Sequence, residues 1–156
     1  MDTATTLMGL GLLMAFLAPV GYLLIEQKIS LRKKEKAIQK IAAENNLFLT
    51  EVDFLPDLAL GIDMDKRKFL SVPHSKKTHV KLIDLGLIQK CEVSKEYNEN
   101  SVSSNLDEVR EIILNINLKN RPPEQLLFYT EEDHPVTEKE MRLAKAGKWQ
   151  KILSDL

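Results

Sequence analysis

The sequence predicts an α+β protein: a transmembrane helix, a helical stalk, and an antiparallel small β-barrel or sheet closed by a C-terminal amphipathic helix. Three observations predict this class. Residues 7–25 carry no charge, residues 47–130 hold short apolar runs separated by turn residues, and residues 137–156 return to helical spacing. We therefore expect an anchor at residues 1–26, a basic juxtamembrane stalk at residues 27–46 and a domain at residues 47–156.

The apolar run is long enough to cross a membrane. As a helix, residues 7–25 cover about 28 Å, which matches the hydrocarbon core of a bilayer. The main alternative is a cleaved signal peptide, which needs a positively charged N-terminal region, yet no Lys or Arg precedes Leu7. A buried helix of a soluble protein is a further alternative. Pro19 predicts a kink, which membrane helices tolerate, so we expect an uncleaved anchor.

Basic residues follow the apolar run and are absent before it. Because positive residues flank the cytoplasmic end of a membrane helix, we expect the N-terminus outside and the domain in the cytoplasm. A single cysteine, Cys91, cannot form an intrachain disulfide and agrees with a reducing compartment. The chain is therefore expected to be a single-pass protein of an inner (plasma) membrane, and this plan suits a bacterium. The basic residues of the stalk are Lys28, Arg32, Lys33, Lys34, Lys36 and Lys40.

The net charge of −1 conceals a division along the chain. Residues 28–40 carry six basic side chains and one acidic one, whereas residues 41–156 carry 16 basic and 20 acidic ones. A slightly acidic domain argues against nucleic acid as a partner. The basic stalk is either a solvated determinant of topology or also a contact for anionic lipid, where each cation gains about 1 kcal/mol. The candidate lipid contacts are Lys28, Arg32, Lys33, Lys34 and Lys36.

Short strands are predicted from Leu47 to Thr130. The clearest is residues 109–120, where Ile112, Leu114 and Ile116 alternate with other side chains at a period of two. Strands joined by turns, without helices between them, indicate an antiparallel sheet or barrel. The polar residues 97–107 predict a loop. The expected strands are residues 47–55, 58–65, 67–73, 79–85, 87–96, 109–120 and 125–130.

Helix ends are predicted on both sides of the strands. The stalk is expected to end at residues 44–46, because Asn tolerates the left-handed conformation of a C-terminal cap. Thr137 and Glu140 match a capping box at the start of the last helix. The only tryptophan, Trp149, is expected to pack into the core rather than to stack on a ligand. Its helix face is predicted from Met141, Ala144, Lys148 or Trp149, Ile152 and Leu156.

No motif predicts catalysis, a metal site or a cofactor. His74, His79, Cys91 and His134 match no zinc spacing, so the histidines are interpreted as scattered surface residues. Cys91 lies in a predicted strand and is expected to be a buried packing residue. The glycines form no phosphate loop and the serines no nucleophile elbow. We therefore expect a protein that is not an enzyme.

Four stretches carry a resemblance to a known family. They are GIDMDKRKFLSV (61–72), IDLGLIQKCEV (83–93), LLFYTEED (126–133) and KWQKILSDL (148–156). With the antiparallel strands and the C-terminal helix, residues 47–156 resemble the pleckstrin-homology-like small barrel, a family that includes bacterial single-pass membrane proteins of uncharacterised role. The resemblance implies a recognition platform for lipid headgroups, peptides or partner proteins. It implies no catalytic residues, since fold alone does not carry function.

Two further surfaces are candidate contacts. A basic group at Lys66, Arg67, Lys68, Lys76 and Lys77 is either a solvated turn or an anionic-membrane contact. Small residues at Gly11, Ala15 and Ala18 form a stripe on which another membrane helix could pack. The resulting prediction is a membrane-anchored, non-enzymatic binding or scaffolding module, with membrane lipids and membrane proteins as partners. The alternative is an accessory subunit of a larger membrane complex, held by its transmembrane helix.

Overall fold

The computed structural model describes Ala15 and residues 32–73, 79–97 and 105–156 of the chain. The chain divides into two compact units, residues 1–46 and residues 47–156. The predicted transmembrane span lies outside the described residues except for Ala15, which is helical. In the part of the chain that the structure describes, no helix has the length and apolar character needed to cross a bilayer.

The described part of the first unit is a helix at residues 32–44. It ends as predicted, because the backbone N–H of Asn45 donates to the carbonyl of Ile41 and Asn46 takes a left-handed conformation with φ of 56°. The side-chain amide of Asn45 also donates to the Ile41 oxygen at 2.8 Å. An asparagine pair thus ends the helix where glycine would otherwise be favoured.

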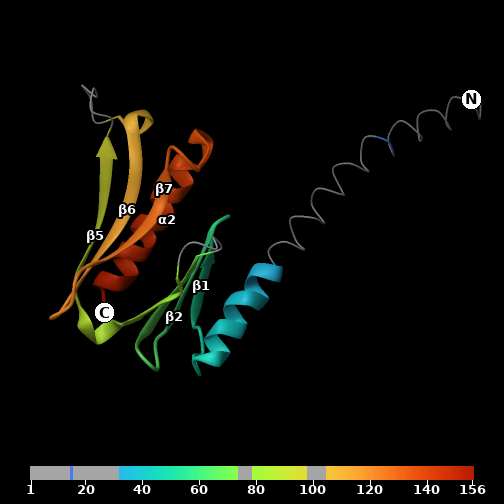
Figure 1. The fold of residues 1–156 in the computed structure, drawn as a ribbon, viewed down its shortest axis with the longest axis vertical. Helices are drawn as coiled ribbons and strands as arrows, with labels where there is room; N and C mark the ends of the chain where they lie inside the picture. The colour runs from blue at the N-terminus through green and yellow to red at the C-terminus, as the bar shows by residue number, and fades with distance from the viewer. Residues whose placement is uncertain (1–14, 16–31, 74–78, 98–104) are drawn as a thin grey trace, which may run out of the picture. The chain divides into compact units, whose positions relative to one another are not determined.

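The second unit contains two antiparallel sheets, each ordered as the chain runs (Figure 1). The first sheet has the order β1-β2-β3-β4 and the second the order β5-β6-β7. The strands are β1 (Glu51–Phe54), β2 (Leu58–Asp63), β3 (Lys68–Pro73), β4 (Lys81–Asp84), β5 (Ile88–Tyr97), β6 (Val109–Leu118) and β7 (Glu124–Thr130). The prediction of an α+β fold with antiparallel strands is confirmed. The described strands form two separate sheets and no closed barrel, because the chain leaves β4 through the short 3-10 helix η1 (Leu85–Leu87) and β5 then pairs with β6.

One core is shared by both sheets and the C-terminal helix α2 (Lys139–Ser154). Figure 1 shows α2 lying against the sheet of β5, β6 and β7, which it contacts through all three strands. The rings of Phe69 from β3 and Trp149 from α2 meet with centroids 5.3 Å apart and planes tilted by 57°, a favourable aromatic arrangement. Trp149 is fully buried, so its prediction as a core anchor is confirmed.

The start and the buried face of α2 differ from the prediction. Thr137 lies inside a 3-10 turn, η3 (Val136–Glu138), and no side chain caps the first turn of α2, so the capping-box prediction is wrong. Met141 and Leu156, expected on the buried face, are exposed. The face that is buried consists of Lys139, Arg142, Ala146, Trp149 and Leu153. A pattern of apolar residues does not predict this face, because two of its members, Lys139 and Arg142, are cations.

The chain before β1 is fixed along β2. The N–H and the hydroxyl of Thr50 both donate to the carbonyl of Ile62, at 2.7 and 2.9 Å. The side chain of Leu49 covers Gly61, where an added Cβ would come within 2.8 Å of a Leu49 methyl carbon. Glycine at 61 therefore allows this segment to approach the sheet closely.

Candidate binding groove

A groove of about 370 Å³ opens in the second unit beside the outer edge of β7. Apolar parts of its wall come from Leu58, Leu126 and Leu127. The polar parts of the wall come from Asp57, Ser71, His79, Lys81, Gln125, Asp133 and His134. A hollow of this size, with apolar walls and a few fixed polar groups, is typical of a ligand site.

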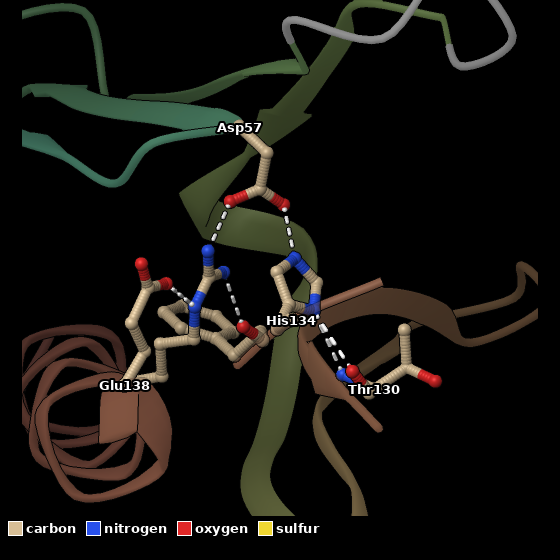
Figure 2. Close-up of polar contacts among 6 residues, drawn as sticks. Asp57, Thr130, His134 and Glu138 are labelled. Atoms are coloured by element: carbon tan, nitrogen blue, oxygen red, sulfur yellow. Dashed lines mark hydrogen bonds and ion pairs between the residues drawn. The ribbon is translucent and has the colours of Figure 1, made fainter. Parts of the chain in front are cut away.

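Two of the polar wall residues belong to a network that ties α2 to both sheets (Figure 2). Asp57 lies in the turn between β1 and β2, and its carboxylate contacts His134 and Arg142 on either side. The distances are 3.1 Å from Asp57 Oδ2 to His134 Nε2 and 2.8 Å from Asp57 Oδ1 to a terminal nitrogen of Arg142. We call Asp57, His134, Glu138 and Arg142 the polar lock.

His134 is held at both ring nitrogens. The backbone N–H of Thr130 donates to its Nδ1 at 3.0 Å, and its Nε2 lies 3.1 Å from Asp57 Oδ2. A ring with a proton on Nε2 and none on Nδ1 satisfies both bonds at once. The His134 side chain is only 9% exposed, so the interpretation of this residue as a surface histidine is wrong. It is buried because the turn after β7 folds it back onto the end of that strand.

Arg142 joins the polar lock to the core side of α2. Its guanidinium contacts Asp57, the Glu138 carboxylate at 2.8 Å and the Phe128 carbonyl at 2.7 Å. The residue is 1% exposed, and a buried cation needs such partners to offset its desolvation. Burial alone would raise the pKa of Asp57, but Arg142, with a smaller contribution from His134, holds the pKa of that carboxyl below its ordinary value.

Three backbone groups of β7 bond to side chains instead of to another strand. Lys81 donates to the Gln125 carbonyl at 3.0 Å and to the Glu124 carboxylate at 2.6 Å. Arg142 bonds the Phe128 carbonyl, and His134 accepts from the Thr130 N–H. A strand edge capped in this way is a poor template for a further strand. The groove therefore favours a ligand that inserts side chains between these caps, where Leu127 is 43% exposed.

The predicted basic group is only partly assembled. Lys66 and Arg67 lie exposed in the turn between β2 and β3, at residues 64–67. Lys68 instead pairs with Asp84 at 2.8 Å, which neutralises it within the sheet. Lys76 and Lys77 lie outside the described residues.

The other predicted contacts belong to the first unit. Arg32, Lys33 and Lys36 are exposed on the helix at residues 32–44, and Lys34 is partly exposed. Lys28, Gly11 and Ala18 lie outside the described residues, and Ala15 is exposed.

The predictions for His79 and Cys91 are confirmed. His79 is exposed, as predicted, and His74 lies outside the described residues. Cys91 is buried, as predicted, and burial raises the pKa of its thiol to about 11. A thiol that stays protonated at neutral pH is a packing group rather than a nucleophile.

Sequence reasoning missed the polar lock. Asp57 and His134 are 77 positions apart, and nothing local in the sequence links them. One pair was visible in principle, because Glu138 and Arg142 have the i, i+4 spacing of a helical ion pair. That spacing alone could not indicate that Arg142 is buried.

Searches against protein-family models, curated proteins and solved structures found no match to this chain.

Proposed function

We propose that this protein is a membrane-anchored, non-enzymatic binding module whose domain at residues 47–156 takes up a partner in the groove beside β7. The four-stranded sheet, the three-stranded sheet and the C-terminal helix support a pleckstrin-homology-like domain, a class built for recognition. The uncharged run at residues 7–25 and the basic residues after it support a single-pass anchor with this domain in the cytoplasm.

The observation that carries the proposal is the polar lock behind the groove. Asp57, His134 and Arg142 are all engaged with one another or with the backbone, so this wall is fixed before any ligand arrives. A preformed site loses less conformational entropy on binding than one that must be ordered. The same contacts argue against catalysis at His134, because both of its ring nitrogens are already occupied.

The partner is expected to present apolar side chains. Leu127 is the exposed apolar residue of the groove wall, at 43%. Two charged residues of the wall are paired within the domain, Lys81 with Glu124 and Asp57 with Arg142. We therefore propose a protein partner rather than a charged metabolite.

Extraction of the full chain from its native membrane tests this proposal. Tagged protein in mild detergent is sized on a native gel and analysed by mass spectrometry for stoichiometric companions. Leu127→Arg should remove the companion, because it places a charge in the groove. Val136→Arg is the matched control, since Val136 is an exposed aliphatic residue that does not line the groove. Loss of the companion from both variants, or from neither, contradicts the proposal.

The alternative function, an accessory subunit held by its transmembrane helix, gives a different result in the same experiment. Gly11→Leu combined with Ala15→Leu would then release the companion, because bulkier residues keep membrane helices apart. Leu127→Arg would leave such a complex intact.

A further inference from the structure

We propose that Phe48 and Met64, with Lys66 and Arg67, form a tip that inserts into the surface of an anionic bilayer. We call these four residues the tip. The inference rests on the proposed membrane anchor and concerns a surface separate from the groove, since none of the four residues lines it.

The apolar part of the tip is unusually open to solvent. Phe48 is 77% exposed and Met64 is 41% exposed. Leaving a phenylalanine this exposed forgoes the hydrophobic gain of burial. A single exposed apolar residue is common, but here Phe48 is accompanied by Met64 in a turn, residues 64–67, that carries two cations and one carboxylate, Asp65.

The fold holds the members of the tip together. The buried carboxylate of Asp63 accepts the backbone N–H of Phe48 at 2.7 Å and that of Lys66 at 2.8 Å. These two backbone bonds, the Lys66 one first, hold the pKa of Asp63 below its ordinary value. The ammonium of Lys66 lies 5.9 Å from the centre of the Phe48 ring. One buried carboxylate thus fixes an aromatic ring beside a basic turn.

The chemistry of the tip fits lipid better than protein. An aromatic ring and a methionine suit the boundary between headgroups and acyl chains, while Lys66 and Arg67 suit the phosphates above it. The charge of the neighbouring chain also favours an anionic membrane. Phe48 comes shortly after residues 28–40, which carry six basic side chains and one acidic one. An upright helical stalk at residues 27–46 would span about 30 Å. The tip can therefore reach the bilayer only if the stalk lies along the membrane surface.

Tryptophan placed at the tip provides the test. The full-length variant Phe48→Trp is reconstituted into vesicles whose lipids carry brominated acyl chains, with or without phosphatidylglycerol. The native Trp149 is fully buried and gives the same background in every variant. Val136→Trp is the control, because Val136 is exposed on the segment before α2.

We expect the emission of Phe48→Trp to be quenched about twofold more strongly than that of Val136→Trp in anionic vesicles. Adding Lys66→Glu and Arg67→Glu, or omitting the anionic lipid, should remove the difference. Equal quenching of the two tryptophans in anionic vesicles overturns the inference, as does a difference that survives charge reversal. Protection of the Phe48→Trp residue from an aqueous quencher in native membranes, but not in these vesicles, indicates a protein on the tip and also overturns it.

An alkaline wash of the same vesicles separates this inference from the proposed function. Protein that stays with the vesicles while its two tryptophans are quenched equally leaves the anchor standing and refutes the tip alone. Protein that the wash releases refutes the anchor, and the tip with it.

Discussion

Trp149 and Arg142 lie on one face of α2, about two helical turns apart, and are buried to nearly the same degree, at 0% and 1% exposed. They are held in opposite ways. Trp149 packs against Phe69 in an apolar core, and its indole N–H has no hydrogen-bond partner among the described residues. Arg142 has a partner for its charge in Asp57 and Glu138 and a further acceptor in Phe128. The part of α2 around Trp149 is therefore held by hydrophobic burial, and the part around Arg142 by ion pairs and a hydrogen bond.

Trp149 mainly adds to the stability of the fold, whereas Arg142 mainly determines where neighbouring segments of the chain lie. Hydrophobic burial is non-directional, so Trp149 stabilises the fold without specifying what lies beside it. Arg142 makes a close ion pair with Asp57 and a charge-assisted hydrogen bond to the Phe128 carbonyl, and such contacts need defined geometry, so Arg142 fixes where the Asp57 turn and the end of β7 lie. Asp57 and His134, which are held by contacts of this second kind, line part of the groove.

The largest effect is expected at the apolar end. Trp149→Ala should lower the free energy of unfolding by about 3–5 kcal/mol, because it removes a fully buried aromatic side chain and leaves a cavity. Denaturant titration of the full chain measures this. Met141→Ala on the exposed side of the same helix should change stability by less than about 0.5 kcal/mol. Equal effects of the two substitutions would show that Trp149 does not anchor the helix.

A somewhat smaller effect is expected at the charged end. Arg142→Met should cost about 3 kcal/mol, since it leaves two carboxylates, Asp57 and Glu138, and the Phe128 carbonyl without their cation. The cost lies at the low end of the range for buried pairs because the Asp57 side chain is 40% exposed. Lys151→Met on the exposed side is the matched control, with an expected change below about 0.5 kcal/mol.

Double variants sharpen the comparison. Arg142→Met and Trp149→Ala should add within about 0.5 kcal/mol, whereas Arg142→Met and Asp57→Asn should cost less together than their sum. If the costs of Arg142→Met and Asp57→Asn in unfolding free energy simply add, the two residues do not interact, which would contradict the polar lock.

The smallest effect is a dependence on pH. Because the pKa of Asp57 is lowered in the folded state, its contribution to stability is present above its ordinary value near 3.8 and is lost as the pH falls through the folded-state pKa. The difference in unfolding free energy between the native chain and Asp57→Asn should therefore be constant above about pH 5 and shrink toward about pH 2. Asp53, Asp63 and Asp84 also have lowered pKa values, but both proteins share them, so they cancel in the difference. A difference that stays constant over this range would show that Arg142 does not act on Asp57.

The same contrast explains what the sequence could predict. The seven strands that the structure describes were predicted close to their observed positions, because a period of two and turn residues are local properties. Trp149 was predicted to be buried because it falls on the face of the last helix that was expected to pack on the sheet, and it is fully buried. The face of α2 was misplaced because Lys139 and Arg142 are buried, and each has a partner far away in the sequence, which for Arg142 is Asp57. Lys139 donates to the Asp107 carbonyl at 2.8 Å, 32 positions away.

The candidate site was harder to predict for the same reason. His134 gains its environment from Asp57, far away in the sequence, and from the end of β7. The basic group predicted from composition lost Lys68 to an ion pair with Asp84 that composition cannot indicate. No sequence pattern predicts that Phe48 is exposed, since its exposure depends on how the chain before β1 runs beside β2.

Photo-crosslinking from the groove tests the central claim most directly. A photoreactive amino acid replaces Leu127 in the full chain, in its native membrane, and the same replacement at Val136 serves as the reference. We predict a discrete adduct from position 127 with a single protein, no matching adduct from position 136, and loss of the adduct when Arg142→Met is added. Identical adduct patterns from the two positions, or an adduct from 127 that Arg142→Met leaves unchanged, would contradict a groove that the polar lock holds ready for a partner.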